Sequence, residues 1–354
     1  MKKYGLFALV FCICFNAHAQ LTLQHGSVFT VGSGARVQVG KDLTSNTDLP
    51  GGTIVMNGST LQHMDMNGFA ISNLEINNSN DVALQTSSIK INNSLAFING
   101  RIQAGAQDLI LGNGATVTGV DASKFIVTNG TGHLVSNVAA ANTIFPVGAT
   151  AGSYTPVTLS NAGTADNFSV RVIPGVLTNG TSGSPLTEKA INRTWLIEEG
   201  TAGGSNATVG LQWNMADELP NFTAGTVYLS HYTNNQWDIT SRQPVTYTAN
   251  VAKISRSNIT SFSPFSVNST AGGSISALQL LPNPVKDILY VQAIGDGPAA
   301  LYVTDAIGRK VREQKVVLNG AGSYTIDVAN LASGMYVLVL DMESGKWEQK
   351  FLKK

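Results

Sequence analysis

The chain is poor in cysteine and in charge. Its only two cysteines, Cys12 and Cys14, lie among the first 19 residues, and 12% of its 354 residues are charged. A chain without those first residues can form neither a disulfide nor a thiolate metal site. Basic and acidic residues number 22 each, and the basic residues do not gather in one stretch. This balance argues against a nucleic-acid partner.

The chain also lacks the Ala-, Leu-, Glu- and Lys-rich stretches of helical proteins. It has 36 glycines and is rich in Val, Ile, Thr, Asn and Ser. β-Branched residues favour strands, whereas glycine and asparagine favour turns. We therefore predict an all-β fold. Its expected parts are a signal peptide (1–19), β-solenoid-like repeats (20–138), a central β-sandwich (139–268), a linker (269–276) and a small Ig-like β-sandwich (277–354).

The first 19 residues have the pattern of a cleavable export signal. The pattern consists of a basic start (Lys2, Lys3), an apolar stretch (6–15) and two small residues at the positions that a signal peptidase recognises (Ala17, Ala19). Cleavage is expected before Gln20. The apolar stretch is too short to cross a bilayer as a helix, and no later apolar run reaches the necessary length, so we expect no transmembrane segment.

Short apolar runs that end in asparagine or glycine recur between residues 20 and 138. The clearest repeat is residues 74–79, which return fifteen residues later as 89–94, and turn residues end such runs at positions 40, 57, 77, 92 and 112. One face of each run is apolar, and a single run cannot bury that face. Stacked coils would bury it. The pattern therefore favours a β-solenoid over the alternative, which is antiparallel hairpins in an ordinary sandwich.

Residues 139–268 contain longer and more aromatic runs, which are typical of sandwich strands. Residues 232–237 predict a hairpin with Asn234 and Asn235 at its tip. Trp237 follows this tip. An exposed indole ring can stack on the apolar face of a sugar, so Trp237 is the best candidate for a sugar contact, while most aromatic residues of this region are expected in the core.

The charge content rises after residue 276. Nine basic and eight acidic residues fall within 277–354, against 25 charged residues in 20–276. Such a change marks a separately folding module, and the small, glycine-rich residues before it predict a flexible linker. Alternating runs separated by turn signals predict a seven-stranded sandwich; they are residues 288–291, 300–303, 324–328 and 335–340.

Four ordered blocks in this module, residues 281–287, 303–311, 326–336 and 350–354, match a known pattern. The matching residues are Pro282, Asn283, Pro284, Asp287, Asp305, Gly308, Leu331, Gly334, Tyr336, Lys353 and Lys354. In these blocks, residues 279–354 resemble the type A C-terminal sorting domain of the type IX (Por) secretion system. One departure is Leu281, which stands where the family often has an aromatic residue.

The resemblance implies a route and a set of partners. Such a domain passes through the periplasm, is recognised by the type IX secretion machinery at the outer membrane, and is then removed by a sortase-like protease. The cut is expected in the linker, and the cargo is released or joined to surface lipopolysaccharide. The resemblance thus implies a secreted or outer-surface protein. The alternative is an ordinary terminal sandwich that mediates adhesion.

Few residues suggest catalysis. The histidines beyond the signal show no zinc-ligand spacing, and no Gly-x-Ser-x-Gly motif is present; these histidines are His25, His63, His133 and His231. Asp65 and Asn67 before Gly68 are a weak calcium candidate, for which a solvated turn is the alternative. We expect no catalytic residues, no metal site and no cofactor.

The carboxylates have to be considered because some proteins with a parallel β-helix fold are enzymes that cleave polysaccharides, and such enzymes use carboxylates for catalysis. The acidic residues to be weighed are the adjacent pairs Glu198 with Glu199 and Asp217 with Glu218, and the solenoid residues Asp108 and Asp121. Neighbours along a strand point to opposite faces, so neither pair is expected to converge. The sequence therefore predicts a non-enzymatic adhesin or surface-structural protein, with glycans or host matrix as candidate partners. The alternative is a carbohydrate-active enzyme (a lyase or glycosidase) or a carbohydrate-binding protein.

Overall fold

A computed structural model of the chain describes residues 20–25, 27, 29–223, 227–238, 243–269, 277–342 and 345–354. The predicted signal peptide, with Ala17 and Ala19, and linker residues 270–276 lie outside the described residues. Within them, the regular structure is β except for one 3-10 turn, η1 (Met215–Asp217). The all-β prediction is confirmed. No helix in the described part of the chain is long and apolar enough to cross a membrane.

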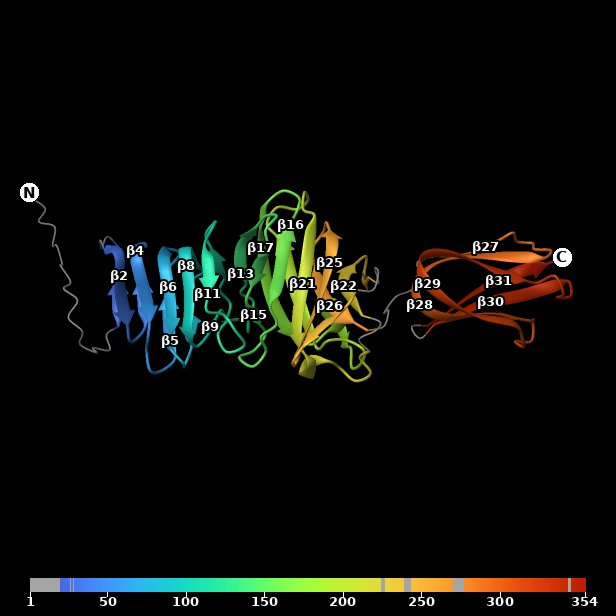
Figure 1. The fold of residues 1–354 in the computed structure, drawn as a ribbon, viewed down its shortest axis with the longest axis horizontal. Helices are drawn as coiled ribbons and strands as arrows, with labels where there is room; N and C mark the ends of the chain where they lie inside the picture. Colours follow the sequence, from blue (N-terminus) through green and yellow to red (C-terminus); the bar gives the residue numbers. More distant parts are fainter. Residues whose placement is uncertain are drawn as a thin grey trace, which may run out of the picture.

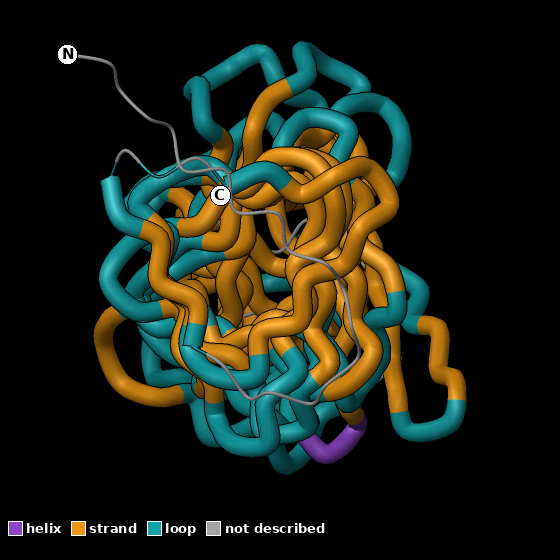
Figure 2. The backbone as a smooth tube through the Cα atoms, turned by 90° about the vertical axis from the view of Figure 1, so that its left-hand side faces the viewer, coloured by secondary structure: helices purple, strands orange, loops and turns teal. Residues whose placement is uncertain are grey.

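Two parallel sheets form the N-terminal part of the body (Figure 1). One has seven strands in the order β1 (Leu21–Leu23), β3 (Leu43–Ser45), β5 (Gln62–Asp65), β7 (Val82–Leu84), β9 (Ile102–Gln103), β12 (Ile126–Val127) and β15 (Val147–Gly148). The parallel strands of the other are β2 (Val31–Val39), β4 (Leu49–Met56), β6 (Ala70–Asn77), β8 (Ile89–Asn99), β10 (Leu109–Leu111), β11 (Thr116–Thr118), which pairs with β8, and β13 (Leu134–Val138). The chain visits the two sheets alternately, so each pass is one coil of a solenoid, and the coils overlie one another when viewed from the N-terminal side (Figure 2).

The repeat of the solenoid lies at the upper end of, or just beyond, the 15 to 20 positions that separate the predicted turns. Leu74 pairs with Leu95, and Ile71 pairs with Ile91, so neighbouring coils are separated by 21 and 20 positions. The predicted turn at Asn92 is wrong, because Asn92 lies inside β8. There the register against β6 shifts, with two residues of β8 opposite one of β6, so the second copy of the local echo, residues 89–94, falls on a bulge.

Polar side chains tie the coils together. Gln62 is buried; its amide nitrogen donates to the main-chain oxygen of Val39 at 2.8 Å, and its Oε1 accepts from Gly58 N at 2.7 Å and from Asn78 Nδ2 at 3.0 Å. Nearer the surface, Asn99 Nδ2 donates to Asn77 Oδ1 of the previous coil at 2.8 Å. Buried amides require such partners, so these residues fix which coil stacks on which.

The second parallel sheet continues into the sandwich without interruption. Beyond β13 the order is β17 (Asp166–Pro174), β20 (Arg193–Glu199), β26 (Pro264–Asn268), β22 (Tyr228–Thr233) and β23 (Gln236–Trp237), all paired antiparallel. The opposing sheet contains β14 (Thr143–Phe145), β16 (Val157–Asn161), β21 (Ala207–Asn214), β25 (Val251–Ile259) and β24 (Thr246–Thr248). A two-stranded ribbon, β18 (Leu177–Asn179) and β19 (Ser182–Pro185), comes between β17 and β20 in the chain.

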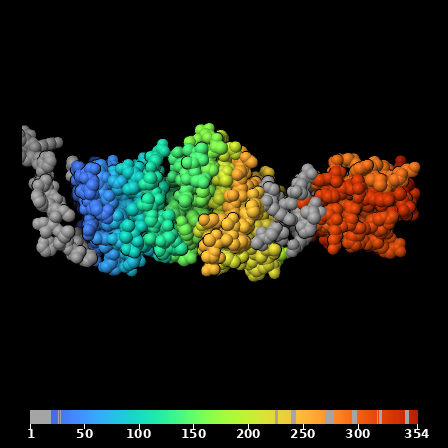
Figure 3. Space-filling view, in the orientation of Figure 1, coloured from blue at the N-terminus to red at the C-terminus, as the bar shows by residue number. Residues whose placement is uncertain are grey.

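One hydrophobic core runs through solenoid and sandwich. It extends from Val31 through Phe97 and Leu134 to Trp195 and Phe265, and the space-filling surface is likewise continuous along this body (Figure 3). The position predicted as a domain boundary, residue 138, is the end of β13, where strand pairing changes from parallel to antiparallel. Solenoid and sandwich therefore form one fused body, because the sandwich sheets cover the last coil.

The C-terminal unit has five strands and a core of its own. They are β27 (Ala277–Leu281), β28 (Ile288–Thr304), β29 (Lys310–Asp327), β30 (Gly334–Met342) and β31 (Gly345–Lys353). Its core includes Leu289, Leu301, Leu338 and Phe351, and it shares no residue with the core of the body. A separate core of this kind is what a separately folding module requires.

The long hairpin β28–β29 folds back on itself. The strands pair from Ile288 with Asp327 to Thr304 with Lys310, yet Arg312 Nε donates to the main-chain oxygen of Asp327 at 3.1 Å. The first part of β28 pairs with β27 and its second part with β30, and Figure 1 shows the ribbon curling between them. The fold divides β28 and β29 into two segments each. Together with β27, β30 and β31, these four segments give the seven segments of the predicted sandwich.

Candidate functional site

The first block of the sorting pattern binds the last strand of the chain. Asn283 Oδ1 accepts from Leu352 N at 3.0 Å, and its Nδ2 donates to the oxygen of Lys350 at 3.4 Å. Val285 N donates to the oxygen of Leu352 at 2.8 Å, and Lys354 N donates to the oxygen of Val285 at 2.9 Å. The exposed Pro282 and Pro284 flank Asn283. This segment therefore covers the edge of β31 as an additional short strand.

The second block is the turn between β28 and β29. Asp305 Oδ1 accepts from Ile307 N at 3.1 Å and Arg309 N at 2.9 Å, and Oδ2 accepts from Arg309 Nε at 2.8 Å. Gly308 has φ +83°, a conformation that side chains disfavour. Desolvation raises the pKa of Asp305, but the hydrogen bonds from Arg309 and Ile307, together with the Arg309 charge, lower it by more. The pKa of Asp305 therefore lies below its usual value.

The third block connects β29 to β30. The main-chain oxygen of Asp287 accepts from Val328 N at 2.8 Å, and Leu331 N donates to the oxygen of Val328 at 3.0 Å. Tyr336 is buried against Phe351, with ring centroids 5.8 Å apart, and its hydroxyl donates to the oxygen of Ala332 at 3.0 Å. Gly334 begins β30 and pairs with Lys353, which is itself buried.

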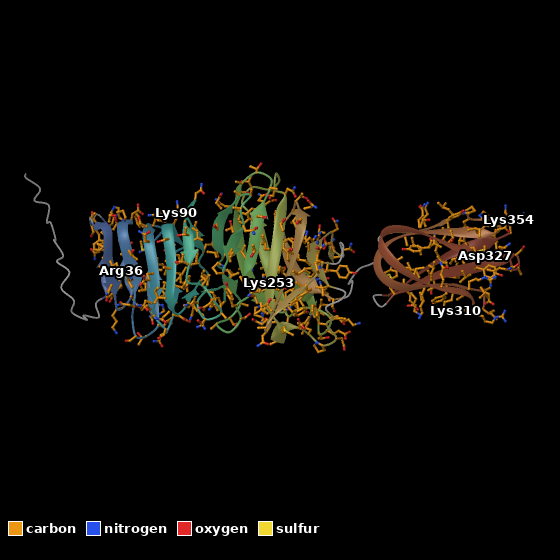
Figure 4. All side chains as sticks on the ribbon, viewed as in Figure 1. Arg36, Lys90, Lys253, Lys310, Asp327 and Lys354 are labelled. Atoms are coloured by element: carbon orange, nitrogen blue, oxygen red, sulfur yellow. The ribbon has the colours of Figure 1, made fainter. Side chains whose placement is uncertain are left out.

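These blocks converge on one end of the unit. The chain enters at Ala277, which pairs with Ile294 at the fold of the long hairpin, and β27 then runs to Leu281 at the opposite end. Val285 and Gly334 both pair with Lys353 at that opposite end. Figure 4 places Asp327 and Lys354 towards that end. The sorting residues thus occupy the end that faces away from the linker attachment point.

Most of these residues fix the fold rather than project from it. Sequence reasoning missed the apolar side chains that this end exposes: Ile307 is 76% exposed and Met335 is 50% exposed, while Leu352, the strand partner of Met335, is 38% exposed. For Met335 and Leu352 the available signal was their alternation with buried neighbours along β30 and β31, whereas Ile307 lies in the turn between β28 and β29. Exposed apolar side chains beside a basic terminus are suited to a protein partner.

The candidate sugar contact in the body is not accessible. Trp237 is 5% exposed, and its Nε1 donates to the main-chain oxygen of Leu177 at 2.8 Å. It packs with Val176, Ala190 and Tyr232 in a small satellite core. The expectation of an exposed ring is therefore wrong. The predicted hairpin is correct, with Asn234 and Asn235 at positive φ, but the ribbon β18–β19 covers its tryptophan.

The calcium candidate is a closed turn. Asp65 accepts from Asn67 N at 3.0 Å, from Ser87 Oγ at 2.7 Å and from Thr86 Oγ1. Burial raises the pKa of Asp65, but these three hydrogen bonds lower it by more. Gly68 completes the turn with φ +86°. Among the residues that the structure describes, no group of three His, Cys, Asp or Glu could hold a metal ion.

The other acidic candidates have separate partners. Asp217 pairs with Arg193 at 2.7 Å, and burial raises the pKa of Asp217 more than this pairing lowers it. Glu218 Oε1 accepts from Trp213 Nε1 at 3.1 Å. Asp108 pairs with His133 at 3.1 Å, whereas Asp121 pairs with Lys124 at 2.9 Å. Glu198 and Glu199 alternate along β20, with Glu198 exposed. The structure does not bring these carboxylates together.

The comparison with known families identifies the C-terminal unit. Residues 279–354, about a fifth of the chain, match the family model of the secretion system C-terminal sorting domain. No curated protein matches the chain. This sorting domain belongs to type IX secretion, so the chain interacts with the type IX secretion machinery and is exported to the cell surface or secreted.

Proposed function

We propose that the exported body is a non-catalytic surface element, an adhesin or a structural component of the cell coat. The observation that carries this proposal is the use of every acidic side chain in residues 20–138 as a structural acceptor. Asp42, Asp48, Asp81 and Asp108 each accept a backbone N–H from the following coil, at 2.8 or 2.9 Å; the four donors are His63, Ala70, Arg101 and His133.

The remaining three acidic residues have other structural partners. Asp65 binds Thr86 and Ser87 of the next coil, Glu75 pairs with Arg36 at 2.5 Å, and Asp121 caps its own turn through Ser123 N at 2.8 Å. Polysaccharide cleavage needs carboxylates that are free to exchange protons with a substrate. Carboxylates held by backbone donors stabilise the stack instead, which favours a rigid, passive body.

Two assays, one on a deletion strain and one on the purified chain, separate this function from the enzymatic alternative. A strain without the chain should lose attachment to glycan- or matrix-coated surfaces, while its growth on pectin, alginate or host glycans should stay unchanged. The purified chain should release no reducing ends and no unsaturated products from these polymers beyond a heat-denatured control. Polymer turnover, or a growth defect without an attachment defect, would instead establish the lyase or glycosidase alternative.

A further inference from the structure

The outer face of the five-stranded sheet in the sandwich carries a groove. Strand β21 alternates along its length: Val209, Leu211 and Trp213 are buried in the core, whereas Thr208, Gly210 and Gln212 face outward. Above these outward residues lies a cavity of about 430 Å³. This volume lies within the range of about 300–1,000 Å³ that is usual for small-ligand sites.

The groove is built from two rows of side chains that cross the sheet. In the first row, Thr158 of β16, Gly210 of β21 and Ser255 of β25 are strand partners. In the second row, Gln212, Lys253 and Thr246 are partners on β21, β25 and β24. Both rows line the cavity. Paired strands hold these side chains at fixed spacings, so the groove is preformed.

Gly210 makes a depression in the middle of the first row, between Thr158 and Ser255. A Cβ at this position would lie 3.4 Å from the Cβ of Thr158 and 3.5 Å from its main-chain oxygen, which are ordinary contacts. Its φ is not in the left-handed region, so the backbone does not require glycine. A side chain would fit at position 210 without strain, and it would occupy the groove.

The polar groups of the groove are available to a ligand. Neither the amide of Gln212 nor the ammonium of Lys253 makes a hydrogen bond or ion pair with another residue in the described part of the chain. The lining supplies hydroxyl and amide groups and the apolar rings of Pro156 and Pro244, and it includes no carboxylate. Hydroxyls and amides suit a ligand that is rich in hydroxyl groups, while an unpaired ammonium suits an anion.

We propose that this groove binds an acidic glycan, a sugar polymer that carries carboxylate groups. Lys253 pairs with a sugar carboxylate, while Gln212, Thr158 and Ser255 bond to sugar hydroxyls. This assignment of a ligand rests on the adhesive role proposed above, and it specifies the class of ligand for that role. The site differs from the one expected at Trp237, because recognition here comes from hydrogen bonds and charge and not from ring stacking.

Titration of the chain from Gln20 to Lys354 with defined oligosaccharides tests the groove. Hyaluronan fragments represent animal matrix, alginate and polygalacturonate fragments represent algal and plant polymers, and dextran fragments serve as the neutral control. We expect at least one acidic series to bind with a Kd below about 1 mM, more weakly as salt is raised, and dextran to bind at least about tenfold more weakly. The series that binds identifies the source of the glycan.

Two variants locate the binding. Lys253→Gln removes the cation and Gly210→Gln fills the depression, and each should weaken binding about tenfold or more. The matched control is Lys90→Gln, which removes an exposed cation from β8 of the solenoid (Figure 4) and should leave binding unchanged. The melting temperature of each variant should stay at the wild-type value, because both positions face outward.

The outcomes are decisive for the groove alone. Absence of binding for every acidic series, normal binding in both groove variants, equal loss in Lys90→Gln, or equal affinity for dextran would each overturn it. Attachment of the deletion strain reports on the adhesive role separately. Lost attachment combined with no oligosaccharide binding would therefore refute the groove and leave the proposed function standing.

Discussion

Asn283 Oδ1 accepts a hydrogen bond from the backbone N–H of Leu352 at 3.0 Å, although the two residues are 69 positions apart. The contact joins the first block of the sorting pattern to the last strand. It gives a physical reason for the two blocks to occur together, because the segment around Asn283 covers the edge of β31, the strand that contains the terminal residues.

Replacement of Asn283 by alanine should loosen the end of β31. The lost side-chain bonds leave two backbone groups without their protein partners, so the free energy of unfolding of the C-terminal unit should fall by about 1–2 kcal/mol. Hydrogen exchange of the Leu352 amide measures the effect directly and should become faster. Asn330→Ala, at an exposed turn position, is the matched control, and equal exchange in both variants would refute this role of Asn283.

Gln62 should be essential for the stacking of the solenoid. Gln62→Leu removes the donor to the Val39 oxygen, which keeps its bond from Asn57 N at 3.1 Å, and it leaves Gly58 N without the Gln62 acceptor. We expect a loss of about 2 kcal/mol in the free energy of unfolding, measured by urea denaturation of the body. Gln85→Leu changes an exposed glutamine of the same solenoid and should cost much less. Similar midpoints for the two variants would contradict this account.

The stability of the body should decline in mild acid because of His231. Its ring is stacked on Phe265 at a centroid distance of 4.5 Å, it is 4% exposed, and its Nε2 has no partner among the described residues. Burial lowers the pKa of His231; Arg256 lowers it further, whereas Asp238 raises it. The folded state thus holds this proton less tightly than the unfolded state, whose pKa is about 6.5.

The sign of the effect follows from this difference. The stabilisation is complete above pH ~6.5 and is lost as the pH falls towards the lower folded pKa. The melting temperature should therefore decrease between pH ~7.5 and ~5, and it should decrease less in His231→Phe. His25→Gln, at an exposed histidine, should behave as the wild type. A His231→Phe variant with the full acid dependence would exclude this histidine as the cause.

The strand pattern was predictable because alternation is a local property. The predicted runs 288–291, 300–303 and 335–340 lie inside β28 and β30, and the hairpin tip at Asn234 lies where the sequence places it. The turn predicted at Asn92 was wrong, because the local echo of residues 74–79 falls on a bulge inside β8 and not at the end of a coil. Continuity of the core across residue 138 depends on pairing between β13 and β17, which no local pattern encodes.

The candidate sites likewise have features that the sequence predicts and features that depend on the folded chain. The sorting residues were recognisable as blocks along the sequence, but their convergence at one end depends on the folded hairpin, which brings Arg312 to Asp327. Trp237 was misjudged because the ribbon that covers it lies 60 positions away. The groove at Gly210 was invisible in the sequence, since its two rows are assembled from four strands.

The central claim is that the C-terminal unit directs export, and deletion of residues 277–354 tests it most directly. The two cores share no residue, so the truncated body should stay folded, which its far-ultraviolet circular dichroism and melting temperature can verify. Cell fractionation with immunodetection should then find the full chain at the surface or in the medium and the truncated chain in the periplasm. Surface delivery of the folded, truncated chain at the wild-type level would contradict the account.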